Sequence, residues 1–347
     1  MPYELPPDPR TERRSRITGR IAFVASLLLI ALVAYFVYVG YEGSRQLTGH
    51  PDPSRDCRTP ATLGWTYEAV NYDIAGDAAL AAEADPTDCS TLGAAAGDEV
   101  TGPGGVGLAA WYVPAASGLP PDGPTVVLVH GWGTNKSDLL ERAALLHGSY
   151  NLLLVDLRNH GQSGAAPTTQ GVREAGDVRA MLDWLEAAKG PDRVAVLGVS
   201  MGGATVLVAA ARDDRIDAVI VESTHATIAS AIQARLENAG YPLAMPGSWA
   251  ILLGTLMRTG TDVSSVDPIQ AVERIDGRPL LLLYGALDDS IGATDHTDIR
   301  DAALAAGIDT ELVVCEAAGH GASLRACPEA YAAAVLGFLG RALDTGG

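Results

Sequence analysis

From residue 125 onward, short apolar runs alternate with longer helical segments. The apolar runs are continuous, as expected of strands that are buried on both faces of a parallel sheet. Six such strands are predicted, at 125–129, 152–155, 194–197, 218–221, 280–283 and 311–314. Helices are predicted between most of them, at 137–147, 171–188, 202–212, 269–275 and 293–306. This alternation predicts an α/β domain with a mostly parallel central sheet and helices on both faces.

The segment 223–267 breaks this rhythm because it is too long for a simple loop. Residues 226–239 and 246–258 look helical, so the segment is predicted to form a small helical cap inserted over the sheet. Further strands are predicted at 66–72 and 108–113, before the regular pattern begins. The intervening glycine-rich stretch is predicted to be a loop or a hairpin.

Near the N-terminus, the 19 residues of 21–39 carry no charge and are long enough to cross a bilayer as a helix. Five arginines precede this stretch, which places the N-terminus in the cytoplasm and the rest of the chain outside it. A cleaved signal peptide is the alternative, although the apolar stretch is longer than a usual signal sequence. The predicted organisation is a disordered cytoplasmic tail (1–20), a transmembrane helix (21–40), a linker (41–56) and a globular domain (57–347) at the cell membrane.

The formal net charge of −18 makes nucleic acid an unlikely partner, since such a surface repels phosphate backbones. Four cysteines, Cys57, Cys89, Cys315 and Cys327, fit an oxidising compartment outside the cytoplasm. Of the three pairings that four cysteines allow, we favour the two local ones, 57 with 89 and 315 with 327. The alternative is that the cysteines are small buried apolar residues. None has the C-x-x-C spacing typical of zinc sites.

The most informative stretch is Gly198-Val199-Ser200-Met201-Gly202, a G-x-S-x-G pattern between an apolar run and a small-residue helix. A serine on a tight strand-to-helix turn is exposed in a strained backbone, and glycines on either side let strand and helix approach closely. The helix start then presents backbone N–H groups to a developing oxyanion. This pattern predicts Ser200 as a nucleophile and the Met201 N–H as one oxyanion donor.

A serine nucleophile needs a base, and the base needs an orienting acid. Of the three histidines after Ser200, we favour His320, which lies in a small-residue loop after the final predicted strand. His225 follows another strand and His296 lies in a predicted helix. Asp288 follows a strand end and is the favoured acid, with its neighbour Asp289 as the alternative.

The second oxyanion donor is expected in the loop after the strand 125–129. This loop reads His130-Gly131-Trp132-Gly133, and the N–H of Trp132 is the favoured donor. We expect His130 to pin the loop through hydrogen bonds rather than to carry a proton.

Over residues 100–340 the sequence resembles the α/β-hydrolase superfamily, most closely its esterase and serine-aminopeptidase-like branch. Besides the two glycine motifs above, the resemblance rests on Gly285-Ala286-Leu287-Asp288, Gly319-His320-Gly321 and the stretch 156–163, which reads Asp-Leu-Arg-Asn-His-Gly-Gln-Ser. It implies an α/β-hydrolase fold, the triad Ser200, Asp288 and His320, and Trp132 and Met201 as oxyanion donors. The stretch 156–163 then has a supporting role, and Asn159 replaces the commoner glycine. The segment before residue 100 has no clear counterpart.

Together these features predict a membrane-anchored serine hydrolase that cleaves esters, with thioesters or amides as alternatives, and uses no cofactor or metal. Its expected partners are a small-molecule or lipid-like acyl substrate and the membrane. The apolar cap residues either line an acyl pocket or pack on the sheet. Two other functions stay open: a binding module without catalysis, and an acyltransferase that uses the same triad with an alcohol acceptor.

Overall fold

A computed structural model describes residues 9–49, 58–70 and 100–343. Its centre is an eight-stranded sheet in the order β1-β4-β6-β5-β7-β8-β9-β10. The six strands from β5 to β10 run parallel, whereas β1 and β4 pair antiparallel at one edge. The bounds are β1 Glu68–Val70, β4 Ala110–Val113, β5 Thr125–Val129, β6 Asn151–Val155, β7 Val194–Val199, β8 Ala218–Glu222, β9 Leu280–Gly285 and β10 Thr310–Cys315. All six strands predicted after residue 125 are therefore confirmed.

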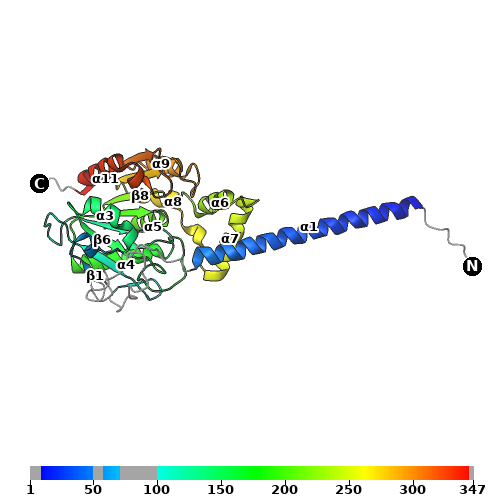
Figure 1. Ribbon diagram of the computed structural model, residues 1–347, viewed down its shortest axis with the longest axis horizontal. Helices are drawn as coiled ribbons and strands as arrows, with labels where there is room; N and C mark the ends of the chain where they lie inside the picture. The colour runs from blue at the N-terminus through cyan, green and yellow to red at the C-terminus, as the bar shows by residue number, and fades with distance from the viewer. Residues whose placement is uncertain (1–8, 50–57, 71–99, 344–347) are drawn as a thin grey trace, which may run out of the picture.

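Helices cover both faces of the sheet (Figure 1). One face packs against α4 (Glu174–Ala188), α5 (Met201–Ala210), α8 (Pro268–Val272) and α9 (Asp295–Ala305). The other face packs against α3 (Leu140–Leu146) and α11 (Pro328–Leu343). Every residue of α5 is buried, as its apolar sequence requires. This buried helix fixes the position of the residue before it, Ser200.

Smaller elements complete the described part of the domain. The glycine-rich stretch 93–107 was predicted to be a loop or a hairpin, and its described part forms a hairpin of β2 (Thr101–Gly102) and β3 (Val106–Gly107), whereas residues 93–99 lie outside the described residues. Short helices lie at η1 (Pro60–Leu63), η3 (Lys136–Leu139) and α10 (Ser323–Ala326). A disulfide joins Cys315 to Cys327, as predicted. The predicted pairing of Cys57 with Cys89 lies outside the described residues.

The segment between β8 and α8 holds α6 (Ile228–Asn238), α7 (Ala244–Thr259) and the short helix η4 (Val263–Ser265). Thr227 and Ser230 form a reciprocal capping box at the start of α6. Gly260, in the left-handed region at φ 65°, ends α7. We call α6 and α7 the cap.

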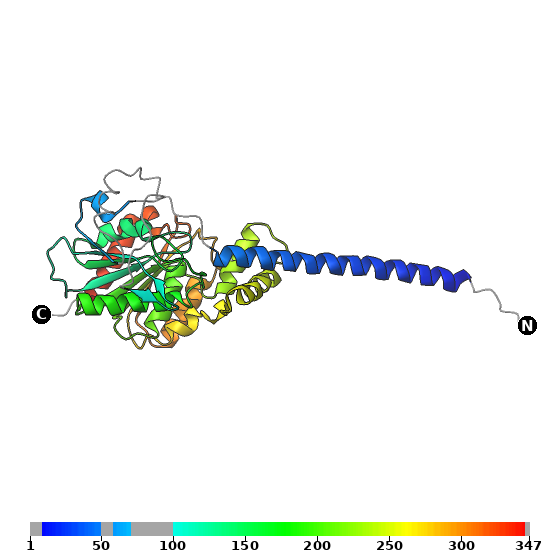
Figure 2. The same cartoon turned by 90° about the horizontal axis from the view of Figure 1, so that it is seen from below.

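The N-terminal helix α1 runs without a break from Pro9 to Thr48 and projects from the body of the molecule (Figures 1 and 2). It is the one helix among the described residues that is long and apolar enough to cross a membrane. The helix is longer than the predicted transmembrane segment 21–40, because residues 9–20 of the predicted tail and 41–48 of the predicted linker are also helical. The C-terminal end is helical because it packs against α7, a contact that local sequence does not reveal.

Candidate active site

Ser200 lies between the last residue of β7 and the first residue of α5, with a backbone φ of 56° and ψ of −118°. A positive φ at a residue other than glycine is strained, and such strain is concentrated at functional sites. The turn is tight: a Cβ on Gly198 would lie 2.3 Å from the Gly202 carbonyl oxygen, and one on Gly202 would lie 2.4 Å from that of Val129. Both glycines of the motif are therefore required by backbone contacts.

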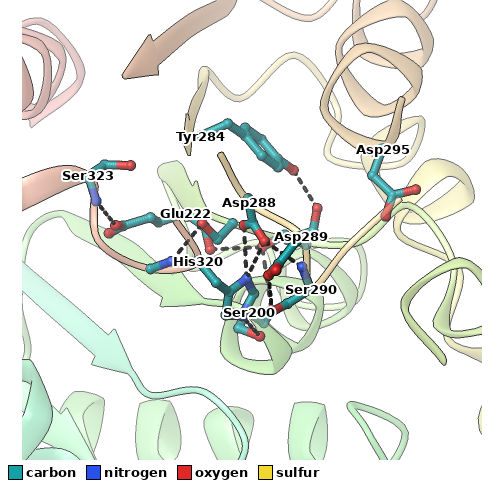
Figure 3. A network of polar contacts seen from close by, with 12 residues as sticks. Ser200, Glu222, Tyr284, Asp288, Asp289, Ser290, Asp295, His320 and Ser323 are labelled. Atoms are coloured by element: carbon teal, nitrogen blue, oxygen red, sulfur yellow. Dashed lines mark hydrogen bonds and ion pairs between the residues drawn. The ribbon is translucent and has the colours of Figure 1, made fainter. Parts of the chain in front are cut away.

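Three predicted residues come together at the carboxyl edge of the sheet (Figure 3). His320 Nε2 lies 2.8 Å from Ser200 Oγ, and His320 Nδ1 lies 2.8 Å and 3.0 Å from the two carboxylate oxygens of Asp288. The hydroxyl, the imidazole and the carboxylate thus form one continuous hydrogen-bonded series. In this arrangement the imidazole is placed to accept the hydroxyl proton while the carboxylate orients the ring.

The structure distinguishes between the two neighbouring aspartates. The Asp288 side chain is only 2% exposed, and its Oδ1 also accepts a hydrogen bond from the Ser290 N–H at 3.0 Å. Asp289 is exposed, and its backbone carbonyl accepts a hydrogen bond from the Asn238 side chain. His320 therefore contacts Asp288.

The other two histidines that follow Ser200 lie elsewhere. His296 lies on α9 and packs against the Tyr284 ring, 5.3 Å between centroids. His225 is buried beside the site, and its Nε2 has no hydrogen-bond partner among the described residues. Burial, together with the charges of Arg235 and His320, lowers the pKa of His225 to about 3, so this ring is neutral at ordinary pH.

The loop after β5 lies against Ser200, since a Cβ on Gly131 would approach the serine Cβ to 3.2 Å. His130 holds this loop: its Nε2 accepts from the Leu157 N–H at 3.1 Å, so its Nδ1 carries the proton and donates to the Gly131 carbonyl at 2.7 Å. Burial lowers the pKa of His130 and keeps it neutral. The expectation that His130 pins the loop is met.

A second histidine supports the same loop. His160 Nε2 accepts from the Gly133 N–H at 3.3 Å, and its Nδ1 donates to the Arg158 carbonyl at 2.8 Å. The pKa of His160 is lowered to about 4, mainly by burial and to a smaller extent by the nearby His130. In the described part of the chain, neither the Trp132 N–H nor the Met201 N–H has an acceptor. Both backbone N–H groups are therefore available as hydrogen-bond donors beside Ser200.

A buried group that local sequence did not reveal holds the His320 loop. The Glu222 carboxylate accepts from Arg142 Nε at 2.8 Å, the Tyr331 hydroxyl at 3.0 Å and the Ser323 N–H at 3.2 Å. Arg142 also donates to the Gly321 carbonyl at 2.8 Å. Burial acts to lower the pKa of Arg142, but the negative charge of Glu222 beside it outweighs burial and raises that pKa. The available signal was a charged residue at the end of the apolar strand 218–222.

Two cavities meet at Ser200. The first, about 250 Å³, lies between α1, the cap and the serine, and we call it the cap cavity. The second, about 230 Å³, lies between the loop after β5 and the His320 loop. Trp132 and Arg235 line both. A substrate with two dissimilar halves has room on either side of the serine.

Comparisons with known proteins agree with this fold. Residues 124–255 match a family model described as the alpha/beta hydrolase fold. The uncharacterized protein YfhR of Salmonella typhimurium is 28% identical over 202 residues, which are 54% of this chain and 62% of that protein. An uncharacterized Mycobacterium tuberculosis protein is 31% identical over 195 residues, 55% of this chain and 60% of that protein. The chain thus spans about three fifths of the length of the curated relatives it matches.

Solved structures show the same architecture. An esterase of Pyrococcus furiosus superposes with a TM-score of 0.64 at 21% identity, covering 85% of this chain and all of that one. The alpha/beta hydrolase GrgF from a Penicillium species superposes with a TM-score of 0.53 at 21% identity, covering 70% of this chain and 96% of that one. The sheet order, the family-model match and the solved structures together show that this chain has the α/β-hydrolase fold.

Proposed function

We propose that this chain is a serine hydrolase that cleaves carboxylic esters through an acyl-enzyme. The observation that carries the proposal is the hydrogen-bonded series from Ser200 Oγ through His320 to Asp288, with 2.8 Å at each step. The hydrolase fold and its esterase neighbours support the same class of activity.

In the proposed reaction, Ser200 Oγ attacks the substrate carbonyl carbon while His320 Nε2 accepts the hydroxyl proton. Asp288 holds the ring and stabilises its positive charge. The carbonyl oxygen becomes an oxyanion and receives hydrogen bonds from the backbone N–H groups of Trp132 and Met201. Collapse of this intermediate breaks the bond to the alcohol, which leaves with the proton from His320. Water, deprotonated by His320, then releases the acid and restores Ser200.

We further propose that α1 anchors the protein as a single-pass helix, with its N-terminus in the cytoplasm and the catalytic domain outside. Its 40 residues span about 60 Å, roughly twice a bilayer's hydrocarbon thickness. Arginines at 10, 13, 14, 16 and 20 lie on the side proposed to be cytoplasmic. The disulfide between Cys315 and Cys327 supports an oxidising compartment for the domain.

A fluorophosphonate probe tests the proposal, because it labels only serines that are activated as nucleophiles. The full chain in detergent micelles is expected to label, whereas folded Ser200→Ala and His320→Ala are not. Ser264→Ala changes an exposed serine of η4 and is the matched control, expected to label like the parent. A folded parent that does not label, and hydrolyses no ester or amide, would overturn the proposal in favour of a binding module. Transfer of the acyl group to an added alcohol in preference to water would instead indicate an acyltransferase.

A further inference from the structure

The C-terminal part of α1 packs closely against α7. A Cβ on Gly40 would lie 2.8 Å from the Ala250 carbonyl oxygen, and a Cβ on Gly254 would lie 2.5 Å from the Gly40 carbonyl oxygen. Small residues spaced in this way let two helix backbones approach, as in membrane helix pairs. Tyr35 donates a hydrogen bond to the Pro242 carbonyl, and Arg258 lies over the Tyr41 ring at 5.2 Å. The start of α7 therefore lies level with Tyr35, and its end lies level with Tyr41 and Ser44.

The end of α1 is also fixed to the hydrolase body. Asn159 Nδ2 donates to the Gly49 carbonyl at 3.0 Å, the Thr168 N–H to the Thr48 carbonyl at 3.1 Å, and Gln170 Nε2 to the Leu47 carbonyl at 3.0 Å. Asn159 is the residue that replaces the commoner glycine of the superfamily motif, and it keeps a φ of 64°. Unlike glycine, Asn159 has a side chain, and this side chain forms a hydrogen bond with the end of α1.

This docking makes α1 a wall of the cap cavity. Ser200 lies in the same cavity, and α1 lines it with the apolar Val39, Gly43 and Leu47, with Tyr38, and with the polar Glu42 and Gln46. Val39 is buried and packs in one apolar cluster with Ile228, Ile232 and Ile251 of the cap. The cavity that holds Ser200 is thus partly built from the helix proposed to cross the membrane.

The outward face of α7 is unusually apolar. Met245, Trp249, Leu253, Leu256 and Met257 are between 42% and 80% exposed, and we call these five residues the cap face. Their spacing of three and four residues places them on one side of the helix. A surface helix of a water-soluble domain carries polar residues on this side, whereas an interfacial helix carries aliphatic residues and tryptophan.

The position of the cap face identifies what covers it. α7 lies alongside residues 35–44 of α1, and its first turns lie level with the end of the charge-free stretch that would sit in the bilayer. Its last turn contacts Tyr41 and Ser44, beyond that stretch, so α7 extends from the edge of the hydrocarbon into the polar interface, where interfacial helices lie. The apolar surface of α1 is therefore continuous with the cap face, and one lipid layer would cover both.

We propose that the cap face lies in the outer interface of the bilayer and that the cap cavity takes the acyl chain of a lipid-like ester directly from it. This inference rests on the proposed function, since it names the substrate class of the same site. The carbonyl of such an ester would reach Ser200 while its chain lies against α1, Ile228 and Ile232. The polar alcohol half would occupy the second cavity, beside Arg142 and His320.

The first test separates membrane-borne from dissolved substrates. The full chain is reconstituted in phosphatidylcholine vesicles, and hydrolysis of a long-chain fluorogenic ester in the bilayer is compared with that of a soluble acetate ester. Leu253→Glu with Met257→Glu is expected to lower the bilayer rate about tenfold or more, because charges oppose insertion, and to leave the acetate rate within about twofold. Leu304→Glu with Leu336→Glu changes two exposed leucines on α9 and α11 and is expected to change neither rate.

The second test addresses the cavity wall. Val39→Trp is expected to lower the ratio of kcat/KM for decanoate and hexadecanoate esters to kcat/KM for the acetate ester about tenfold, because the added ring fills space that each further methylene of the chain needs. Val33→Trp, at an exposed position of the same helix, is the matched control. If Val39→Trp does not fold, Leu47→Trp at a half-buried position of the same wall replaces it.

Fluorophosphonate labelling distinguishes the two ways of failing. A parent that neither labels nor hydrolyses refutes the proposed function itself. The other outcome is a parent that labels and cleaves the acetate ester. If the cap-face variant then has the same bilayer rate as its control, and the cavity variant the same chain-length profile as its control, this inference alone is overturned.

Discussion

Replacing Asp288 with asparagine tests the electrostatic part of the proposed mechanism. The carboxylate is 2% exposed and lies 2.8 Å from His320 Nδ1, so water is not positioned to replace it. At an effective dielectric constant of about 20, opposite charges about 4 Å apart attract by about 4 kcal/mol, which corresponds to roughly 10³ in rate when the imidazolium forms.

The substitution also changes which ring nitrogen carries the proton. The Ser290 N–H donates to Asp288 Oδ1, so the oxygen of the introduced amide is expected at that position and its NH₂ group faces His320. An amide donor at Nδ1 forces the proton onto Nε2, where the ring no longer accepts the Ser200 proton. The two effects together predict a fall in kcat of about 10⁴-fold, or about 5.5 kcal/mol.

The assay is the steady-state rate with a soluble acetate ester, with the melting temperature measured alongside to establish folding. Asp289→Asn is the matched control and is expected to keep kcat within about threefold, because its side chain is exposed and does not contact His320. The proposed role of Asp288 is refuted if folded Asp288→Asn retains more than about a tenth of the parent kcat, or if Asp289→Asn loses as much activity as Asp288→Asn.

Three further predictions concern stability, each followed by thermal or denaturant unfolding of the full chain in micelles. Cys315→Ser is expected to cost about 3 kcal/mol, since the bond closes a loop of 12 residues, and an unchanged midpoint in reductant-free buffer would contradict this. Gly202→Ala is expected to cost about 1–3 kcal/mol and most of the activity, because a Cβ there would meet backbone oxygen at 2.4 Å, whereas Gly148→Ala, with open space, should be neutral. His225, with a pKa of about 3 when folded, binds a proton more readily when unfolded, near pH 6.5. The contribution of neutral His225 to the free energy of unfolding is therefore complete above pH 6.5 and falls as pH decreases, by about 2 kcal/mol at pH 5. His225→Phe is expected to flatten this part of the plot of unfolding free energy against pH.

Local sequence determined the strands, most helices and the position of the proposed nucleophile. Continuous apolar runs have one stable place in a soluble domain, the centre of a covered sheet, so the six parallel strands followed from the pattern alone. The turn around Ser200 could be predicted because Gly198 meets the backbone of Gly202 only four residues away, whereas the contact of Gly202 with the Val129 carbonyl depends on the neighbouring strand. His320 and Asp288 were named from chain order and loop chemistry, and the structure brings their side chains within hydrogen-bond distance.

Tertiary structure decided what depends on residues distant in sequence. Asp288 and Asp289 have the same chemistry, and only the packing of the loop after β9 turns one toward His320 and the other to solvent. The buried Glu222 acts through Arg142, 80 positions earlier, so no local pattern reveals its hold on the His320 loop. Likewise, residues 41–48 are polar enough to resemble a linker. They are helical and line the cap cavity because α7 and the hydrolase body supply contacts that the segment lacks by itself.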